Sequence, residues 1–316
     1  MVRHTRKDFI AGLGGLFAVA SLPTCGEDNP AVFPERGKSS RLNLSYAHIS
    51  AGATEPFSIL HISDTHLTAA YPDEGEKVIA FHERRRRTFG GRQEEALRDS
   101  LDWARDNVDY VLHTGDLIDW QSRANFDLVR KHFGAQMFGC LGNHEYRSSD
   151  LKYIPKEDAK ARCRDAVAAV YPFNVRFFAK TVNGITFVTL DNVFGTVQPD
   201  QVEMFKAEAA KGRPIILCTH VPLHTPAIWR FQKQYWGCIG KKFRFAQVPE
   251  PLGDCHRQLT DTVTRDFIDY LKGEPLLKGI LAGHLHITAE DRFSHTATQY
   301  LVGGNYGFCG REVLFT

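Results

Sequence analysis

The stretch YVLHTGDLID, Tyr110 to Asp119, decides the fold of this chain. It begins with Tyr110, Val111 and Leu112, a short apolar and β-branched run that predicts a buried strand. Gly115 permits a sharp backbone turn and so places Asp116 at the end of that strand. A carboxylate in this position has two oxygens and can bind two metal ions at once. We therefore interpret Asp116 as a bridging metal ligand.

Four other apolar runs are followed by side chains of the types that bind metals. In an open α/β sheet, ligands gather where strands end at their carboxyl edge, so the side chains after these runs are expected to meet. Residues 58–63 precede Asp64 and His66, residues 136–141 precede Asn143, His144 and Glu145, residues 214–218 precede His220, and residues 279–282 precede His284 and His286.

The residue types indicate which metals the site binds. Asp64 and His66 are two residues apart, as are His284 and His286, and this spacing puts both side chains of a pair on one face of an extended segment. Imidazoles and carboxylates with one neutral amide, here Asn143, suit zinc, iron or manganese rather than calcium.

In chain order, the motifs read Asp-x-His, Gly-Asp, Gly-Asn-His-Glu, His and Gly-His-x-His, and this series resembles the calcineurin-like metallophosphoesterases. The motifs run from Asp64 to His286 and so cover most of the chain. Each is weak alone, but five in order, each after a strand-like run, are specific. The string looks most like the class III cyclic-nucleotide phosphodiesterase branch. The resemblance implies an α/β fold, a four-layer α-β-β-α sandwich with two mixed β-sheets flanked by helices.

The resemblance also implies two divalent metal ions (Mn, Fe or Zn) and assigns their ligands. The first motif is Asp-x-His rather than the Asp-x-Gly of purple acid phosphatases, so tyrosine–iron charge transfer is not expected. Trp120 follows Asp119, where protein Ser/Thr phosphatases have Asp-Arg-Gly, which argues against a phosphoprotein substrate. One metal is held by the residues matching Asp64, His66, Asp116 and His286, and the other by those matching Asp116, Asn143, His220 and His284.

These residues predict hydrolysis without a serine or cysteine nucleophile. Two ions roughly 3.5–4 Å apart clamp a phosphate and lower the pKa of a bridging water, and the resulting hydroxide attacks phosphorus. If Asn143 is a ligand, its neighbour His144 points elsewhere on the turn. We assign His144 to the leaving group as general acid, a role worth roughly 10²–10⁴ in rate. The resemblance implies that Asp119 orients His144.

The substrate expected first is a phosphodiester or a small phosphate ester, because the motif string is of the phosphodiesterase type. The nearest alternative is a phosphomonoesterase. A second alternative is a catalytically inactive exported protein that keeps metals for structure or to capture phosphate ligands. The presence of every expected ligand argues against this second alternative.

The N-terminus has the layout of an export signal. Basic residues precede an apolar stretch, 9–22, which is shorter than a typical membrane span. Residues 5–10 resemble the twin-arginine export motif, with Lys7 in place of the second arginine. Residues 22–25 loosely resemble a lipoprotein cleavage box, with Cys25 as the acylated residue. We expect an exported, periplasmic or extracytoplasmic protein, with an export signal at 1–25, a linker or irregular arm at 26–54 and the catalytic domain at 55–316.

Composition limits the classes of partner. The formal charge of +2 is close to balance, so nucleic acid is not favoured as a main partner. Apart from Cys25 the chain has six cysteines, an even number that permits disulfides in an exported protein. Cys238 and Cys255 are the pair expected first. Cys140 and Cys218 fall in strand-like runs, where a small buried thiol is the commoner state.

Two further regions leave alternatives open. The run Arg84 to Arg87 is either a lid or clamp for a substrate phosphate or a solvated face. The aromatic and basic region Val221 to Leu259, expected to be a long loop, is either a substrate wall or a small satellite core.

His61 and His113 are expected to be strand histidines near the site rather than ligands. Glu145 is expected to be structural. Helices are expected at 92–106, 122–132, 156–170, 201–211 and 263–271, and further strands at 177–180, 186–190, 299–302 and 313–315.

Overall fold

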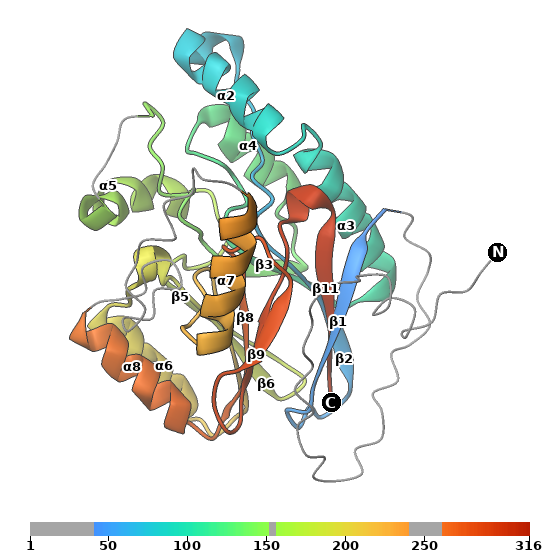
Figure 1. The fold of residues 1–316 in the computed structure, drawn as a ribbon, viewed down its shortest axis with the longest axis vertical. Helices are drawn as coiled ribbons and strands as arrows, with labels where there is room; N and C mark the ends of the chain where they lie inside the picture. Colours follow the sequence, from blue (N-terminus) through green and yellow to red (C-terminus); the bar gives the residue numbers. More distant parts are fainter. Residues whose placement is uncertain (1–40, 152–155, 240–260) are drawn as a thin grey trace, which may run out of the picture. The chain divides into compact units, whose positions relative to one another are not determined.

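Two mixed β-sheets form the centre of the fold, with helices on the outer face of each (Figure 1). The structure is a computed structural model in which residues 41–151, 156–239 and 261–316 are described. This arrangement confirms the four-layer sandwich expected from the motifs.

The first sheet carries the first three motifs. Its parallel strands β2, β3 and β4 lie side by side, so their carboxyl ends meet at one edge. The antiparallel strand β11 joins β2 to the edge strand β1, which runs parallel to β11. In spatial order the strands are β1 (Asn43–Ile49), β11 (Cys309–Phe315), β2 (Phe57–Ile62), β3 (Tyr110–Thr114) and β4 (Met137–Cys140).

The second sheet carries the last two motifs, at the ends of β7 and β8. These two strands are parallel, as are β6 with β7 and β8 with β10, while the outer strands β5 and β9 are antiparallel to their neighbours. The spatial order is β5 (Phe177–Val182), β6 (Ile185–Leu190), β7 (Ile215–Thr219), β8 (Leu277–Ala282), β10 (Thr298–Leu301) and β9 (Ala289–Arg292).

Alternation along the strands divides the apolar residues between the layers. In β2, Ile59 faces the second sheet, while Leu60 and Ile62 face the helices. Phe187 of β6 contacts Phe315 edge-on across the gap between the sheets. The first sheet is covered by α3 (Gln93–Asn107), α4 (Arg123–His132) and α5 (Lys156–Ala168), and the second by α6 (Pro199–Ala209) and α8 (Thr262–Gly273).

Among the described residues, two further α-helices and three 3-10 helices lie in the connections between these elements. Helix α2 (Glu76–Thr88) follows the first motif and the short 3-10 helix η1 (Pro72–Glu74). Helix α7 (Pro226–Ile239) packs Ile228 and Trp229 against Leu285. The 3-10 helix η2 (Val193–Gly195) follows β6, and η4 (Asn305–Gly307) precedes β11.

The structure corrects two expectations. Residues 43–49 were expected to belong to a linker or irregular arm, but they form β1, because their backbone pairs in register with the C-terminal strand β11. The region 221–259 was expected to be one long loop, but residues 226–239 form α7, whose buried face packs on residues of the last motif. Residues 240–260 lie outside the described part of the chain.

The described cysteines Cys140, Cys163, Cys218 and Cys309 are free thiols, and Cys140 and Cys218 are buried in strands, as expected. The expected pair of Cys238 and Cys255 lies outside the residues whose side chains are described, as does the expected export signal. Within the described ranges, no helix combines the length and apolar character needed to cross a membrane.

Candidate metal centre

The five motifs occupy turns that follow β2, β3, β4, β7 and β8 at the carboxyl edges of both sheets. These turns have an unusual backbone. Asp64, His66, Asp116, His284 and His286 all have positive φ angles, between 52° and 68°. Left-handed backbone is costly for residues with a Cβ atom and tends to occur at functional sites. All five are residues that the sequence predicts as metal ligands.

Two glycines let the turns approach one another. A Cβ atom on Gly142 would lie 2.2 Å from Asp116 Oδ1, and one on Gly283 would lie 1.8 Å from Ser63 Oγ. Both distances are far below van der Waals contact. Gly142 is therefore required where its turn packs against the turn of Asp116, and Gly283 is required where its turn packs against Ser63.

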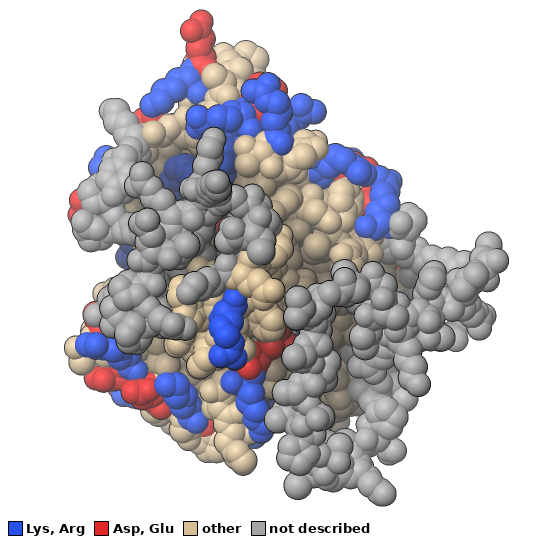
Figure 2. All heavy atoms as spheres, viewed as in Figure 1, with Lys and Arg blue, Asp and Glu red and all other residues tan. Residues whose placement is uncertain are grey.

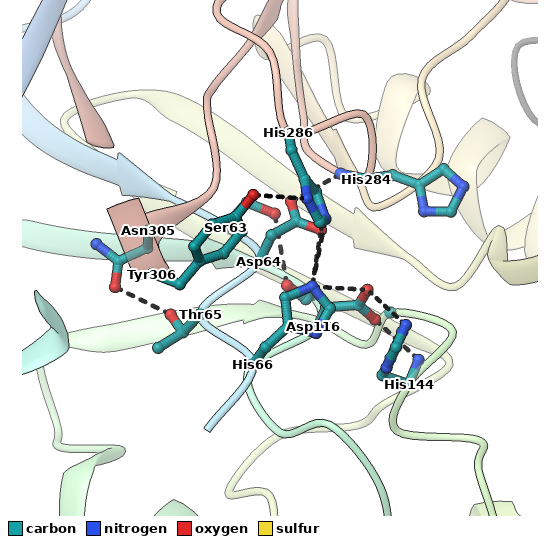
Figure 3. A network of polar contacts seen from close by, with 12 residues as sticks. Ser63, Asp64, Thr65, His66, Asp116, His144, His284, His286, Asn305 and Tyr306 are labelled. Atoms are coloured by element: carbon teal, nitrogen blue, oxygen red, sulfur yellow. Dashed lines mark hydrogen bonds and ion pairs between the residues drawn. The ribbon is translucent and has the colours of Figure 1, made fainter. Parts of the chain in front are cut away.

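One group of donors is formed by Asp64, His66 and His286 (Figure 3). His66 Nε2 lies 3.2 Å from His286 Nε2, and Asp64 Oδ1 lies 3.1 Å from His286 Nε2. Three donor atoms from two motifs therefore converge, although the motifs lie at opposite ends of the described chain.

A second group is formed by Asp116, His220 and His284. His220 Nε2 lies 3.0 Å from His284 Nδ1, 3.3 Å from Asn143 Oδ1 and 3.4 Å from Asp116 Oδ2. The amide of Asn143 thus joins the second group, as the sequence predicts.

A single oxygen of Asp116 faces both groups. Asp116 Oδ2 is 3.7 Å from His66 Nε2 and 3.4 Å from His220 Nε2. The other oxygen, Oδ1, accepts a hydrogen bond of 2.8 Å from the backbone N–H of His144. The carboxylate therefore presents one oxygen to both groups, whereas the sequence argument relied on two oxygens.

The donor set fits divalent transition metals. Asp64 Oδ1 is fully buried and faces the ring nitrogens of His286 at 3.1 Å and His66 at 3.9 Å, so a cation among these three atoms would compensate the buried charge. Imidazole nitrogens that face one another at 3.0–3.2 Å can direct their lone pairs to a common ion. Nitrogen and carboxylate donors in this mixture suit zinc, iron or manganese. The seven predicted ligands are thus brought together, and their binding of metal stays a prediction.

Electrostatics favours ionised carboxylates in the centre. Burial alone would raise the pKa of Asp116, but His220 and His144 hold it well below its usual range. Burial and the nearby His144 lower the pKa of His66 to about 4, which leaves that ring neutral at pH 7, as metal binding requires. Burial would lower the pKa of His220, but the carboxylates of Asp116 and Asp64 raise it to about 9.

Asp119 connects the predicted general acid with a predicted ligand. Its Oδ1 lies 2.6 Å from His144 Nδ1 and accepts a hydrogen bond of 3.1 Å from His66 Nδ1. Arg85 of α2 donates to both carboxylate oxygens. Although burial opposes it, the contact with His144 holds the pKa of Asp119 well below its usual range. Asp119 therefore orients two imidazoles, whereas the sequence predicted a contact with His144 alone.

Glu145 is structural, as expected, and it fastens two turns together. Its buried carboxylate accepts backbone N–H bonds of 3.0 Å from Asp116, 3.1 Å from Ile118 and 2.7 Å from Gly142. The hydroxyl of Tyr171 donates to it as well, at 3.1 Å. The turns after β3 and β4 are held in register by this one side chain.

His61 and His113 are strand histidines, as expected, and belong to neither donor group. His61 Nε2 lies 2.8 Å from Thr114 Oγ1, and His113 Nε2 lies 2.9 Å from Thr65 Oγ1. Burial lowers the pKa of His113 to about 3. Both rings support the strand ends on which the centre is built.

Sequence reasoning missed several residues that support the ligands. Phe89 stacks on the ring of His66, with 4.1 Å between centroids, and Tyr306 Oη lies 3.2 Å from His286 Nδ1. Asn305 accepts a hydrogen bond from Thr65 Oγ1 (Figure 3). Arg85, which contacts Asp119, was also missed, although the sequence does mark it, since it falls in the arginine run 84–87. Phe89, Asn305 and Tyr306 belong to no metal-type motif.

The family model described as calcineurin-like phosphoesterase matches residues 57–288. Among solved structures, a dimetal phosphatase from Danio rerio is 15% identical, with 80% of this chain and 89% of that chain covered and a TM-score of 0.47. A calcineurin-like phosphoesterase from Bacillus subtilis is 12% identical, with 80% and 82% covered and a TM-score of 0.39. No curated protein matches the sequence. The family match thus rests on the same segment that carries all five motifs.

The role of Gly142 can be tested by Gly142→Ala. The added methyl would displace Asp116, so we expect loss of at least one of two bound metal ions per chain, measured by elemental analysis after dialysis against Mn²⁺. Gly134→Ala is the matched control, because nothing lies within 4 Å of its Cβ position. Full metal content in Gly142→Ala, with the folded circular dichroism spectrum retained, would contradict the proposed packing of the two turns.

Proposed function

We propose, on the premise that the chain belongs to the calcineurin-like phosphoesterase family and is a phosphoester hydrolase, that its preferred substrates are phosphodiesters or small phosphate esters. The family is dimetal-dependent, and the chain has candidate groups of metal ligands. The hydrolytic centre that this proposal needs is supported by the position of Asp116 Oδ2, which faces both donor groups at distances of 3.4–3.7 Å from a histidine of each.

The described residues would hold two ions of Mn, Fe or Zn, with Asp116 shared between them. When bound, such a pair of ions supplies Lewis acidity toward a phosphoryl oxygen and lowers the pKa of water. Asp64, His66 and His286 would complete the first set of ligands, and Asn143, His220 and His284 would complete the second.

His144 is placed to donate a proton to the leaving group. Its Nε2 lies 3.9 Å from Asp116 Oδ2, so the ring faces the centre, and 13% of its side chain is exposed, so a substrate can reach it. Asp119 holds Nδ1 on the opposite side of the ring. A carboxylate at Nδ1 fixes the orientation of the imidazole, so that Nε2 is the nitrogen that faces the centre and the leaving group.

The preference for a diester is supported by the motif string. Its first motif is Asp-x-His, and its second lacks the Asp-Arg-Gly of protein phosphatases. The nearest competing activity is hydrolysis of phosphomonoesters, which the same ligands could support. Kinetic comparison of the two ester types therefore decides between them.

Substitutions at Asp116 and His144 test the mechanism. Asp116→Asn removes the charge that faces both donor groups, and we expect loss of metal and of turnover. His144→Ala should retain both metals and lower kcat by roughly 10²–10⁴, since general acid catalysis contributes about that much. The exposed residue His295 provides the control His295→Ala, expected to have unchanged kcat. Undiminished activity in either Asp116→Asn or His144→Ala would overturn the assigned roles.

The substrate class is tested by hydrolysis of bis(p-nitrophenyl) phosphate and p-nitrophenyl phosphate by the manganese- or zinc-loaded protein. We expect a higher kcat/KM for the diester. A higher value for the monoester would identify a phosphomonoesterase instead. Absence of turnover of both esters, with two metals bound, would favour a protein that captures phosphate ligands.

We also propose that the protein is exported, because basic residues precede the short apolar stretch 9–22. Fractionation of cells that express the chain with a C-terminal tag tests this, together with mass spectrometry of the tagged protein. We expect cleavage near Cys25 and recovery outside the cytoplasm, with a lipid mass on Cys25 if the anchor is used. Full-length protein confined to the cytoplasm would refute export.

A further inference from the structure

Three arginines gather on one side of the candidate centre, around Phe81 and Asp119. The guanidinium carbon of Arg84 lies 4.8 Å from the centroid of the Phe81 ring, and that of Arg147 lies 5.7 Å from it. Arg85 and Arg147 both approach Asp119. Figure 2 shows Lys and Arg side chains gathered over the part of the molecule where Figure 1 places α2.

Of the three arginines, only Arg85 forms hydrogen bonds with the carboxylate of Asp119. It donates to both oxygens of Asp119, which are also approached by two imidazoles, so this buried carboxylate has little capacity left. Arg147 Nη1 lies 3.7 Å from Asp119 Oδ2, beyond hydrogen-bond distance. Arg85 is thus a positioning residue for Asp119, and Arg147 is not held in the same way.

Among the described residues, no carboxylate accepts a hydrogen bond from the guanidinium of Arg84 or of Arg147, and Arg147 has only the longer ion pair with Asp119. Within the described residues, neither guanidinium donates a hydrogen bond, and Arg84 has no ion pair. The carboxylate of Glu83, which precedes Arg84, lies 3.6 Å from His82 Nε2. The charges of Arg85 and Arg84 oppose that of Arg147, while the carboxylates of Asp119 and Asp116 favour it. Like charges near one another are unfavourable, and an added anion would relieve this repulsion.

Arg147 lies close to His144, the predicted general acid. Arg147 donates its backbone N–H to the carbonyl of His144 at 3.1 Å, so both belong to the turn after β4. Its side chain is 34% exposed, so part of it can be reached from solvent. Planar guanidinium groups bind phosphate and carboxylate oxygens through paired hydrogen bonds. An anion held here would lie beside the predicted general acid.

We propose that Arg84 and Arg147 form a subsite for a second anionic group of the substrate, a phosphate or carboxylate outside the ester that is cleaved. The inference rests on the proposed function, since it names a substrate feature of the same centre. Phe81 supports both guanidinium groups, and Arg85 keeps Asp119 occupied so that the other two arginines remain open to the ligand. The preferred phosphoester accordingly carries at least one further negative charge.

Sulfate binding tests the subsite without turnover. In the zinc-loaded protein labelled with ¹⁵N in arginine, the side-chain Nε–H signals are assigned by single alanine substitutions and followed as sulfate is added. We expect the signals of Arg84 and Arg147 to shift together and to saturate with one Kd. Arg84→Ala should weaken the response of Arg147 by about tenfold or more, roughly the loss of one charge-assisted hydrogen bond.

Arg86 provides the control, because it lies on the same helix but its guanidinium is directed to Gly91. Arg86→Ala should leave the sulfate response of Arg147 unchanged. Signals of Arg84 and Arg147 that move no more than that of Arg86, or an Arg147 response unaffected by Arg84→Ala, would overturn the shared subsite.

Two substrates that differ by one phosphate connect the subsite with catalysis. These are the p-nitrophenyl ester of thymidine 5′-phosphate and the same ester with an added 3′-phosphate. We expect about tenfold higher kcat/KM for the second, and a ratio near one in Arg147→Ala. An unchanged ratio in Arg147→Ala would contradict the role in specificity.

The two readouts separate the two proposals. Saturable sulfate binding at Arg84 and Arg147 without hydrolysis of any ester would retain the subsite and refute the proposed function. Hydrolysis with no sulfate response at these arginines would retain the function and refute the subsite.

Discussion

The whole centre depends on one buried carboxylate, that of Glu145, and on the four hydrogen-bond donors that surround it. Two of these donors are the backbone N–H groups of Asp116 and Gly142, which belong to turns after different strands. A buried carboxylate is tolerable only if its oxygens are satisfied, so this arrangement fixes the relative position of both turns. The position of Asp116, the predicted shared ligand, is thus fixed through its backbone, which has a left-handed φ angle.

Charge organises the second layer of the centre. Asp119 is buried, yet it stays ionised because Arg85 and two imidazoles face it. Helix α2 supplies Arg85, and the residue that follows it, Phe89, stacks on His66. A helix that carries no ligand of its own therefore positions one ligand directly and two histidines through Asp119. Asp119 and Phe89 determine how the imidazole rings are oriented, whereas the strand ends determine only the backbone positions of these histidines.

Much of the fold and the centre could be predicted from the sequence, because strands with apolar runs end in turns that carry the motifs. The fold, the family and the convergence of seven side chains follow from that pattern. Strand β1 was missed because its sequence, NLSYAHI, has little apolar alternation and becomes a strand by pairing with residues 309–315. Helix α7 was missed because its apolar face is buried only by packing against Leu285, which is distant in sequence. Tyr306 and Phe89 gave no signal, since their partners are distant in sequence.

The pairing of His66 with His286 joins residues 220 positions apart. A centre built in this way has no local precursor: a growing or truncated chain that stops before β8 lacks two histidines and the turn that holds them. The complete set of donors therefore exists only after the two sheets have docked, and ions held by all of them would enter late in maturation. Such ions would bind the folded state alone and stabilise it by mass action, so the lifetime of the finished molecule would depend on the availability of metal.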